Sequence, residues 1–342
     1  MTQGVYSLRV IHLCALFCLF WFPGTTVLFA ADSVLIVTPQ GEETTLQGEI
    51  ESLTGSQGLL LKEAGHTAST VIPFHRVLRI DTERTAAHVA GDVAFAQGEQ
   101  SGELSQYATA ITNYAQARQT DEVRTWVRVW LTWRLLLCYE RLGRVDEAVG
   151  EFFLLCRIDP YTPFWENVPL LWTKRALSTA GTDTITAQAR LWLSRQKNPA
   201  ERETPAARLL AASYLLDAPD PALRRQALDA LTQLAVLTPS QDATESMQNI
   251  VSGISRLAMA QLVRTRIARD TNPADLDRLE KLIELLPPAA TPGLRLTLAT
   301  GRMNLNEVEK AREQYQRVSV SPWAAPELRA AANALLTNRN SK

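Results

Sequence analysis

The feature that most constrains this chain of 342 residues is a change of residue pattern near Thr82. Before Thr82, short apolar runs alternate with glycine-containing stretches; beyond it, apolar residues recur at α-helical spacing almost to the end. Prolines cut the second region into pieces of helical-hairpin length, because proline begins or ends helices but rarely lies inside them. These prolines are Pro199, Pro205, Pro219, Pro221, Pro239, Pro273, Pro287 and Pro322. We therefore expect a mainly α protein, with helices over 84–340 and a small β domain over 31–83.

The β domain is predicted to contain five short strands. Between Leu46 and Glu51, apolar and polar residues alternate with the period of two that marks a half-buried strand. Five strands in about fifty residues indicate a small, strongly bent antiparallel sheet or barrel. In topology it resembles the SH3-like and Sm-like small barrels. The expected strands are 33–37, 45–53, 58–62, 69–73 and 77–81.

Residues 1–30 have the order of segments found in a secretory signal peptide. Arg9 precedes an almost wholly apolar run over 10–22, Pro23 breaks that run, and small residues follow at Ala30 and Ala31. We expect cleavage after Ala30 and an exported protein of the periplasm or cell envelope. The alternative is an uncleaved N-terminal anchor, which would then be the only contact with a membrane.

One stretch of the helical region carries a recognisable repeat pattern. Gly143 separates two helical patterns, and Ala148, Phe152, Leu155 and Pro160 follow it at fixed spacing. With Leu135 and Tyr139 upstream, residues 129–162 resemble the tetratricopeptide repeat, a helix–turn–helix unit of 34 residues. The pattern departs from the family at Thr132 and Leu136.

Weaker copies of this pattern recur along the chain. They cover about 84–117, 208–241, 243–288 and 292–325, and a closing helix is expected over 326–337. A single hairpin cannot bury its apolar faces, whereas stacked hairpins bury them against each other. The resemblance therefore implies an α-solenoid of tetratricopeptide-like hairpins behind a small β-barrel-like domain.

The resemblance also implies a binding groove, because the first helix of each tetratricopeptide hairpin lines the concave face. Tryptophan and arginine are among the residues most enriched at binding hot spots. The candidate groove residues are Trp130, Trp133, Leu137, Glu140 and Arg141, with His88 and Asp92 from the first repeat. The alternative is that the tryptophans fill core between hairpins. A second aromatic group is expected in the core, with a wall of the groove as the alternative, and it consists of Tyr161, Phe164, Trp165 and Trp172.

The sequence contains no pattern typical of catalysis, metal binding or cofactor binding. His66, His75 and His88 do not form a His-Glu-x-x-His motif, and each is expected at the surface or in a turn. Cys138 and Cys156 lack the Cys-x-x-Cys spacing of a redox or zinc site. We expect both cysteines as free, buried thiols, with a disulfide between them as the alternative that an exported protein permits. We therefore predict no enzyme, no metal and no cofactor.

Charge argues against a nucleic-acid partner. The net charge is −1 at pH 7, and acidic residues outnumber basic ones in the β domain. We predict a non-catalytic scaffold or adaptor of the cell envelope that binds a peptide or partner domain in its helical groove. The alternatives are an accessory protein or enzyme of envelope polymer metabolism, and a structural homo-oligomer that pairs β-strand edges.

Overall fold

A computed structural model describes residues 32–120, 124–170, 179–194, 204–216 and 218–337. Within 179–183 it describes the backbone alone. The predicted signal segment at 1–30, most of the predicted surface connection at 197–205, and Trp172 lie outside the described residues.

The five predicted strands are confirmed, and they form one antiparallel sheet in the order β4-β3-β2-β1-β5. The strands are β1 (Asp32–Val37), β2 (Glu43–Thr54), β3 (Gly58–Glu63), β4 (Thr70–Ile72) and β5 (Val77–Asp81). A 3-10 helix, η1 (Phe74–Arg76), links the two edge strands β4 and β5. The long strand β2 pairs with both β1 and β3, and its register with β3 shifts between Ile50 and Ser52. Such a shift bends a strand and increases its twist.

Alternation within β2 sets which face of the sheet is buried. Gly48 and Ile50 are buried, whereas Gln47, Glu49 and Glu51 are exposed. Because successive side chains of a strand point to opposite faces, this register directs the apolar residues of β2 into the core.

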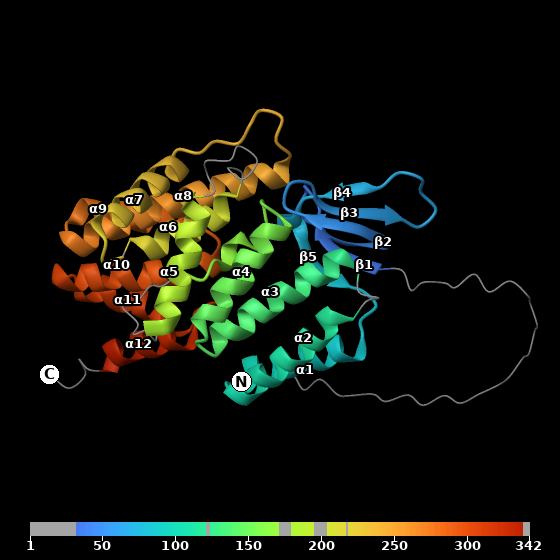
Figure 1. Ribbon diagram of the computed structural model, residues 1–342, viewed down its shortest axis with the longest axis horizontal. Helices are drawn as coiled ribbons and strands as arrows, with labels where there is room; N and C mark the ends of the chain where they lie inside the picture. Colours follow the sequence, from blue (N-terminus) through green and yellow to red (C-terminus); the bar gives the residue numbers. More distant parts are fainter. Residues whose placement is uncertain (1–31, 121–123, 171–178, 195–203, 217, 338–342) are drawn as a thin grey trace, which may run out of the picture.

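The rest of the described chain is helical. The longer helices are α1 (Ala86–Ser101), α2 (Leu104–Gln119), α3 (Thr125–Arg141), α4 (Val145–Ile158), α5 (Thr179–Ser194), α6 (Pro205–Leu215), α7 (Pro221–Ala235), α8 (Glu245–Arg269), α9 (Pro273–Glu284), α10 (Pro292–Asn304), α11 (Val308–Ser319) and α12 (Pro326–Thr337). Two further 3-10 helices are η2 (Trp165–Asn167) and η5 (Pro288–Ala290). Helices that follow each other in sequence pack side by side, and the sheet lies at one end of the helical body (Figure 1). No helix in the described part of the chain is both long and apolar enough to cross a membrane.

The hairpin of α3 and α4 has the contacts expected from its repeat pattern. Gly143 makes the turn with φ of 68°, a left-handed conformation that glycine adopts without steric cost. Ala148, Phe152 and Leu155 are fully buried along α4. Cys138 on α3 and Cys156 on α4 are buried and unpaired, as expected of free thiols. Burial raises the pKa of Cys138 to about 12, so this thiol is not a nucleophile at neutral pH.

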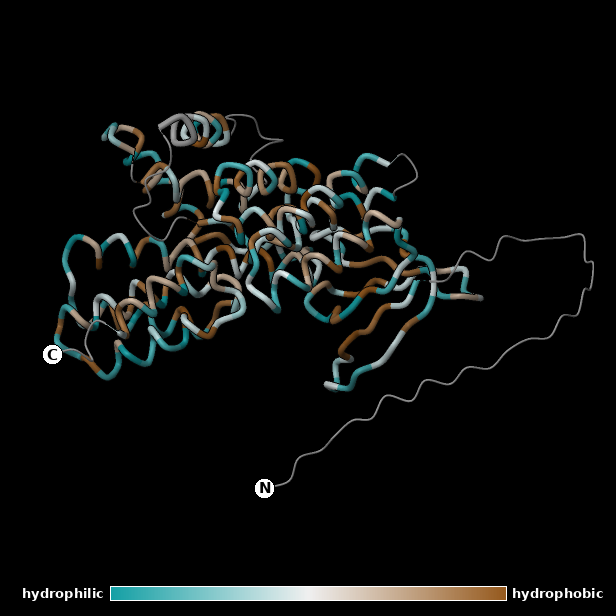
Figure 2. Tube along the Cα trace, turned by 90° about the horizontal axis from the view of Figure 1, so that it is seen from below, coloured by the Kyte–Doolittle hydropathy of each residue, from teal (hydrophilic) through white to brown (hydrophobic). Residues whose placement is uncertain are grey.

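The sheet is joined to the helical body by specific polar contacts as well as by apolar packing. Arg124, just before α3, donates from both terminal nitrogens to the carboxylate of Asp32 at 2.7 and 2.9 Å. The backbone N–H of Gly55 donates to the Asp159 side chain at 2.6 Å, and Thr244 at the start of α8 bonds the carbonyl of Ser56. In the hydropathy view, hydrophobic positions gather where the sheet meets the helices, whereas hydrophilic positions predominate along the outer turns (Figure 2).

Candidate functional site

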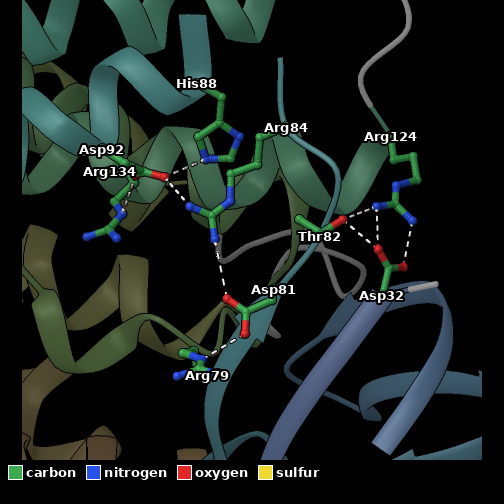
Figure 3. Close-up of polar contacts among 9 residues, drawn as sticks. All are labelled: Asp32, Arg79, Asp81, Thr82, Arg84, His88, Asp92, Arg124 and Arg134. Atoms are coloured by element: carbon green, nitrogen blue, oxygen red, sulfur yellow. Dashed lines mark hydrogen bonds and ion pairs between the residues drawn. The ribbon is translucent and has the colours of Figure 1, made fainter. Parts of the chain in front are cut away.

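The predicted residues His88 and Asp92 belong to a polar cluster between α1 and α3 (Figure 3). The carboxylate of Asp92 lies 2.7 Å from the nearer nitrogen of Arg84, 3.6 Å from His88 Nε2 and 3.7 Å from Arg134 Nε. The hydroxyl of Tyr114 also donates to Asp92 at 2.7 Å. These four neighbours all contact the Asp92 carboxylate from within the protein.

The expectation that His88 lies at the surface is wrong, because its side chain is buried on the inner face of α1. Its ring packs edge-on against Tyr114. Burial lowers the pKa of His88, Asp92 opposes this effect, and the guanidinium groups of Arg84 and Arg134 add to it. A buried histidine held neutral beside a saturated carboxylate stabilises the packing of α1 on α2.

Trp130 and Trp133 lie further along α3 and share Arg134 as a neighbour. The guanidinium carbon of Arg134 lies 5.9 Å from the Trp130 ring centre and 5.1 Å from that of Trp133. Trp133 stacks on Phe164 at 4.8 Å and donates from Nε1 to Asn167 at 2.9 Å. Both tryptophans are half-buried and are largely occupied by these internal contacts.

Arg141, at the end of α3, connects three parts of the fold. Its side chain is 6% exposed, and Nε donates to Glu99 of α1 at 2.7 Å. A terminal nitrogen donates to the carbonyl of Pro322, in the connection between α11 and α12, at 2.8 Å. These bonds make Arg141 an internal tie between distant segments rather than a free anchor for a partner.

Three of the predicted residues, Leu137, Glu140 and Arg141, line one cavity of about 100 Å³. Segment 167–170, residues near η5 and the start of α12 form the other walls. Leu137 contributes an apolar wall, and Trp323 is 46% exposed while also lining the cavity. We call this site the α3 cavity. It is concave, mostly apolar and supplied with a few polar groups, as ligand pockets usually are.

Glu140 is the least satisfied polar group of the α3 cavity. It has no hydrogen-bonding or ion-pair partner within the described part of the chain. Burial raises the pKa of Glu140 to about 7, and the charge of Arg141 opposes that rise. The neighbouring cation is already bonded to Glu99, so the Glu140 carboxyl is available to a group from outside.

The chain matches no known family model, curated protein or solved structure.

The site divides the seven predicted residues between two places. Leu137, Glu140 and Arg141 share the α3 cavity, whereas the other four lie in the packed region around Arg134. Sequence reasoning did not identify Arg134 or Trp323. For Arg134 a signal was available, since it lies one helical turn after Trp130 and so faces the same side of α3. Trp323 is nearly 190 residues from Leu137 in sequence, and no local pattern links them.

In the described residues, no group of three or more histidine, cysteine, aspartate or glutamate side chains is placed to hold a metal ion. The α3 cavity combines one unpartnered carboxyl with apolar walls, an arrangement suited to holding a ligand.

Replacing Glu140 with glutamine is expected to change how stability depends on pH. Between its ordinary pKa of 4.5 and about 7, folded Glu140 keeps a proton that the unfolded chain releases. Wild-type stability therefore falls as pH rises through this window. At about pH 8, Glu140→Gln should be more stable by about 1–3 kcal/mol, and at about pH 4 the two proteins should be equal. Urea unfolding across this pH range measures the difference.

The matched control is Glu147→Gln, on the neighbouring helix α4, where the glutamate is 39% exposed and paired with Arg144. This change should alter stability by less than about 0.5 kcal/mol at any of these pH values. A pH profile unchanged by Glu140→Gln would show that the Glu140 carboxyl is solvated in the folded protein.

Proposed function

We propose that this protein is a non-catalytic binding protein that holds a peptide segment of a partner in the α3 cavity. The observation that carries the proposal is the unpartnered Glu140 carboxyl in a cavity whose other walls are mostly apolar. The exposed Trp323 supplies an aromatic surface of the kind enriched at binding hot spots.

The wider proposal concerns fold and location. The helical hairpins would form a tetratricopeptide-like solenoid, the sheet a small barrel, and the chain an exported adaptor of the cell envelope. Neighbour-to-neighbour packing of the helices and the α3–α4 hairpin support the first part. The register shift between β2 and β3 supports the proposal of a small barrel. Export is proposed from the sequence of residues 1–30 alone.

The α3 cavity is suited to recognition because its walls are held by the fold. Arg141 ties α3 to α1 and to the segment before α12, and Asn167 is held by Trp133. Walls fixed before binding reduce the entropy lost when a ligand docks. Binding by rigid presentation needs no bond-making chemistry.

The test is a selection of peptides from a random phage-displayed library on the full-length protein. Binding of the selected peptides is then measured by fluorescence polarisation. Peptides that occupy the α3 cavity should bind at least about tenfold more weakly to Trp323→Ala and to Glu140→Ala, because both changes remove a group that faces the peptide. Circular dichroism establishes that each variant is folded.

Val71→Ala is the matched control, because Val71 is a 54%-exposed apolar residue on the edge strand β4. It should leave affinity unchanged. Peptides that lose affinity with Val71→Ala and keep it with the two cavity variants would move the binding site to the sheet edge and overturn the proposal. The proposal would also be overturned if no selected peptide lost affinity with either Trp323→Ala or Glu140→Ala.

A further inference from the structure

A second and larger cavity lies at the junction between the sheet and the helices. Its volume is about 310 Å³. Phe74 and His75 of η1 line it from the sheet, and residues of η2, α8 and the end of α9 line it from the helical body. We call it the junction cavity. It shares no lining residue with the α3 cavity and lies on the other side of η2, since Glu166 faces the junction cavity whereas Asn167 lines the α3 cavity.

The side chain of Glu166 lines the junction cavity and has no positively charged partner in the described residues. It forms no hydrogen bond or ion pair in the part of the chain that the structure describes. Burial raises the pKa of Glu166 to about 7, and among the residues that the structure describes no neighbouring charge contributes to that rise or opposes it. A buried carboxylate without a partner is costly, so a cation brought by a ligand would be strongly favoured here.

The other ionisable groups that face the junction cavity are engaged elsewhere or exposed. His75 of η1 contacts Asn249 through Nδ1 at 2.9 Å and Glu245 through Nε2 at 3.3 Å. Arg256 of α8 is exposed, and its contact is the carbonyl of Leu285 at 3.5 Å. Glu284, at the end of α9, is exposed to solvent. None of them supplies the counter-charge that Glu166 lacks.

Apolar residues form part of the lining of the junction cavity, beside polar side chains such as Ser246 and Asn249. The apolar lining residues include Phe74, Pro163, Trp165, Ile250, Leu286 and Pro287. Trp165 packs directly on α8 at Gly253, where an added Cβ would lie 2.3 Å from the indole ring. Aromatic faces attract cations, and apolar walls suit an alkyl chain. The cavity can therefore hold a cationic group beside Glu166 and an alkyl group against its apolar lining residues.

We propose that the junction cavity binds a primary alkylammonium group, with Glu166 as its counter-ion and the apolar walls around its aliphatic chain. The group could come from a free alkylamine or from the side chain of a lysine residue, and both have the same chemistry at Glu166. This site is separate from the proposed peptide site and does not depend on it.

The test is calorimetric titration of the full-length protein with n-pentylamine and, as a neutral molecule of similar length, n-pentanol. At about pH 8, n-pentylamine should bind at least about tenfold more tightly than n-pentanol, and Glu166→Gln should remove that preference. The matched control Glu284→Gln, a carboxyl at the same cavity, should change the affinity less than about twofold. Circular dichroism checks that the variants are folded.

The affinity of the wild type for n-pentylamine should rise between about pH 6 and pH 8, because binding requires ionised Glu166. The same titration with His75→Gln tests whether Glu166 alone produces this rise, and this variant should keep it. Parallel titration with Nα-acetyl-lysine methylamide compares a lysine side chain with a free alkylamine. The compound that binds more tightly shows which of the two the cavity prefers. Equal binding of n-pentylamine and n-pentanol, or equal binding by wild type and Glu166→Gln, would overturn the proposal.

Discussion

Replacing Arg124 with methionine is expected to lower the free energy of unfolding by about 3 kcal/mol, because it leaves the buried carboxylate of Asp32 without its counter-ion. Asp32 is 2% exposed and accepts bonds from Arg124 and from the hydroxyl of Thr82 (Figure 3). It also accepts a bond from the backbone N–H of Ile50. Burial alone would raise the pKa of Asp32, but these hydrogen bonds, with that of Arg124 foremost, lower it. Urea denaturation at neutral pH measures the loss.

The sign of the pH dependence follows from the lowered pKa. The ionised Asp32 stabilises the fold above the ordinary pKa of the carboxyl, and this stabilisation is lost as pH falls through the lowered folded value. The difference between wild type and Arg124→Met should therefore narrow as pH falls below about 4.

Arg79→Met is the matched control for this prediction. Arg79 pairs with Asp81 at 2.7 Å, but the two side chains are 67% and 46% exposed. Water already solvates both charges, so this change should cost less than about 1 kcal/mol. Equal losses for Arg79→Met and Arg124→Met would show that the bond between Arg124 and Asp32 does not hold the sheet against α3.

Replacing Gly55 with alanine is expected to destabilise the protein by about 3 kcal/mol, because the added methyl group has no space. An ideal Cβ at Gly55 would lie 1.3 Å from the carbonyl oxygen of Tyr161. That atom belongs to the backbone and cannot rotate away. The movement that relieves the clash also stretches the bond from Gly55 N–H to Asp159. Urea denaturation measures the loss, and near-ultraviolet circular dichroism reports the packing of nearby aromatic residues.

Gly150→Ala makes the same chemical change where no atom lies within 4 Å of the new methyl group. Gly150 lies inside α4, so alanine there should increase stability by about 0.5–1 kcal/mol. Gly55→Ala is thus expected to lower the free energy of unfolding, and Gly150→Ala to raise it. A Gly55→Ala protein as stable as wild type would contradict the close contact between the β2–β3 turn and the helical body.

Much of the local structure was predictable because short-range patterns determine it. The alternation around Gly48 and Ile50 marked β2, and the spacing from Gly143 to Leu155 marked the α3–α4 hairpin. Prolines also mark the starts of helices, as at Pro205 and Pro221. These signals depend on residues close in sequence, and the structure has the elements where they indicate them.

The candidate site was predictable only in part, because long-range contacts decide which side chains remain free. The stripe of Leu137, Glu140 and Arg141 was correctly placed on one helix, but Arg141 is bonded to Glu99 and to the carbonyl of Pro322. His88 was expected at the surface, yet it is buried against Tyr114. No pattern within α1 or α3 indicates these partners, since Tyr114 lies on α2 and the two partners of Arg141 belong to other hairpins.

The contacts between the sheet and the helical body have a consequence for synthesis of the chain. The bond between Ser56 and Thr244 joins residues 188 positions apart. At roughly 5–20 residues added per second, the ribosome needs about 10–40 s to make the second partner after the first. During that interval the nascent sheet has its docking face uncovered, and its apolar residues are open to chaperones or to neighbouring chains. The strands of the sheet are thus made before every helix of the body, and they reach their final surroundings only after the start of α8 has been made.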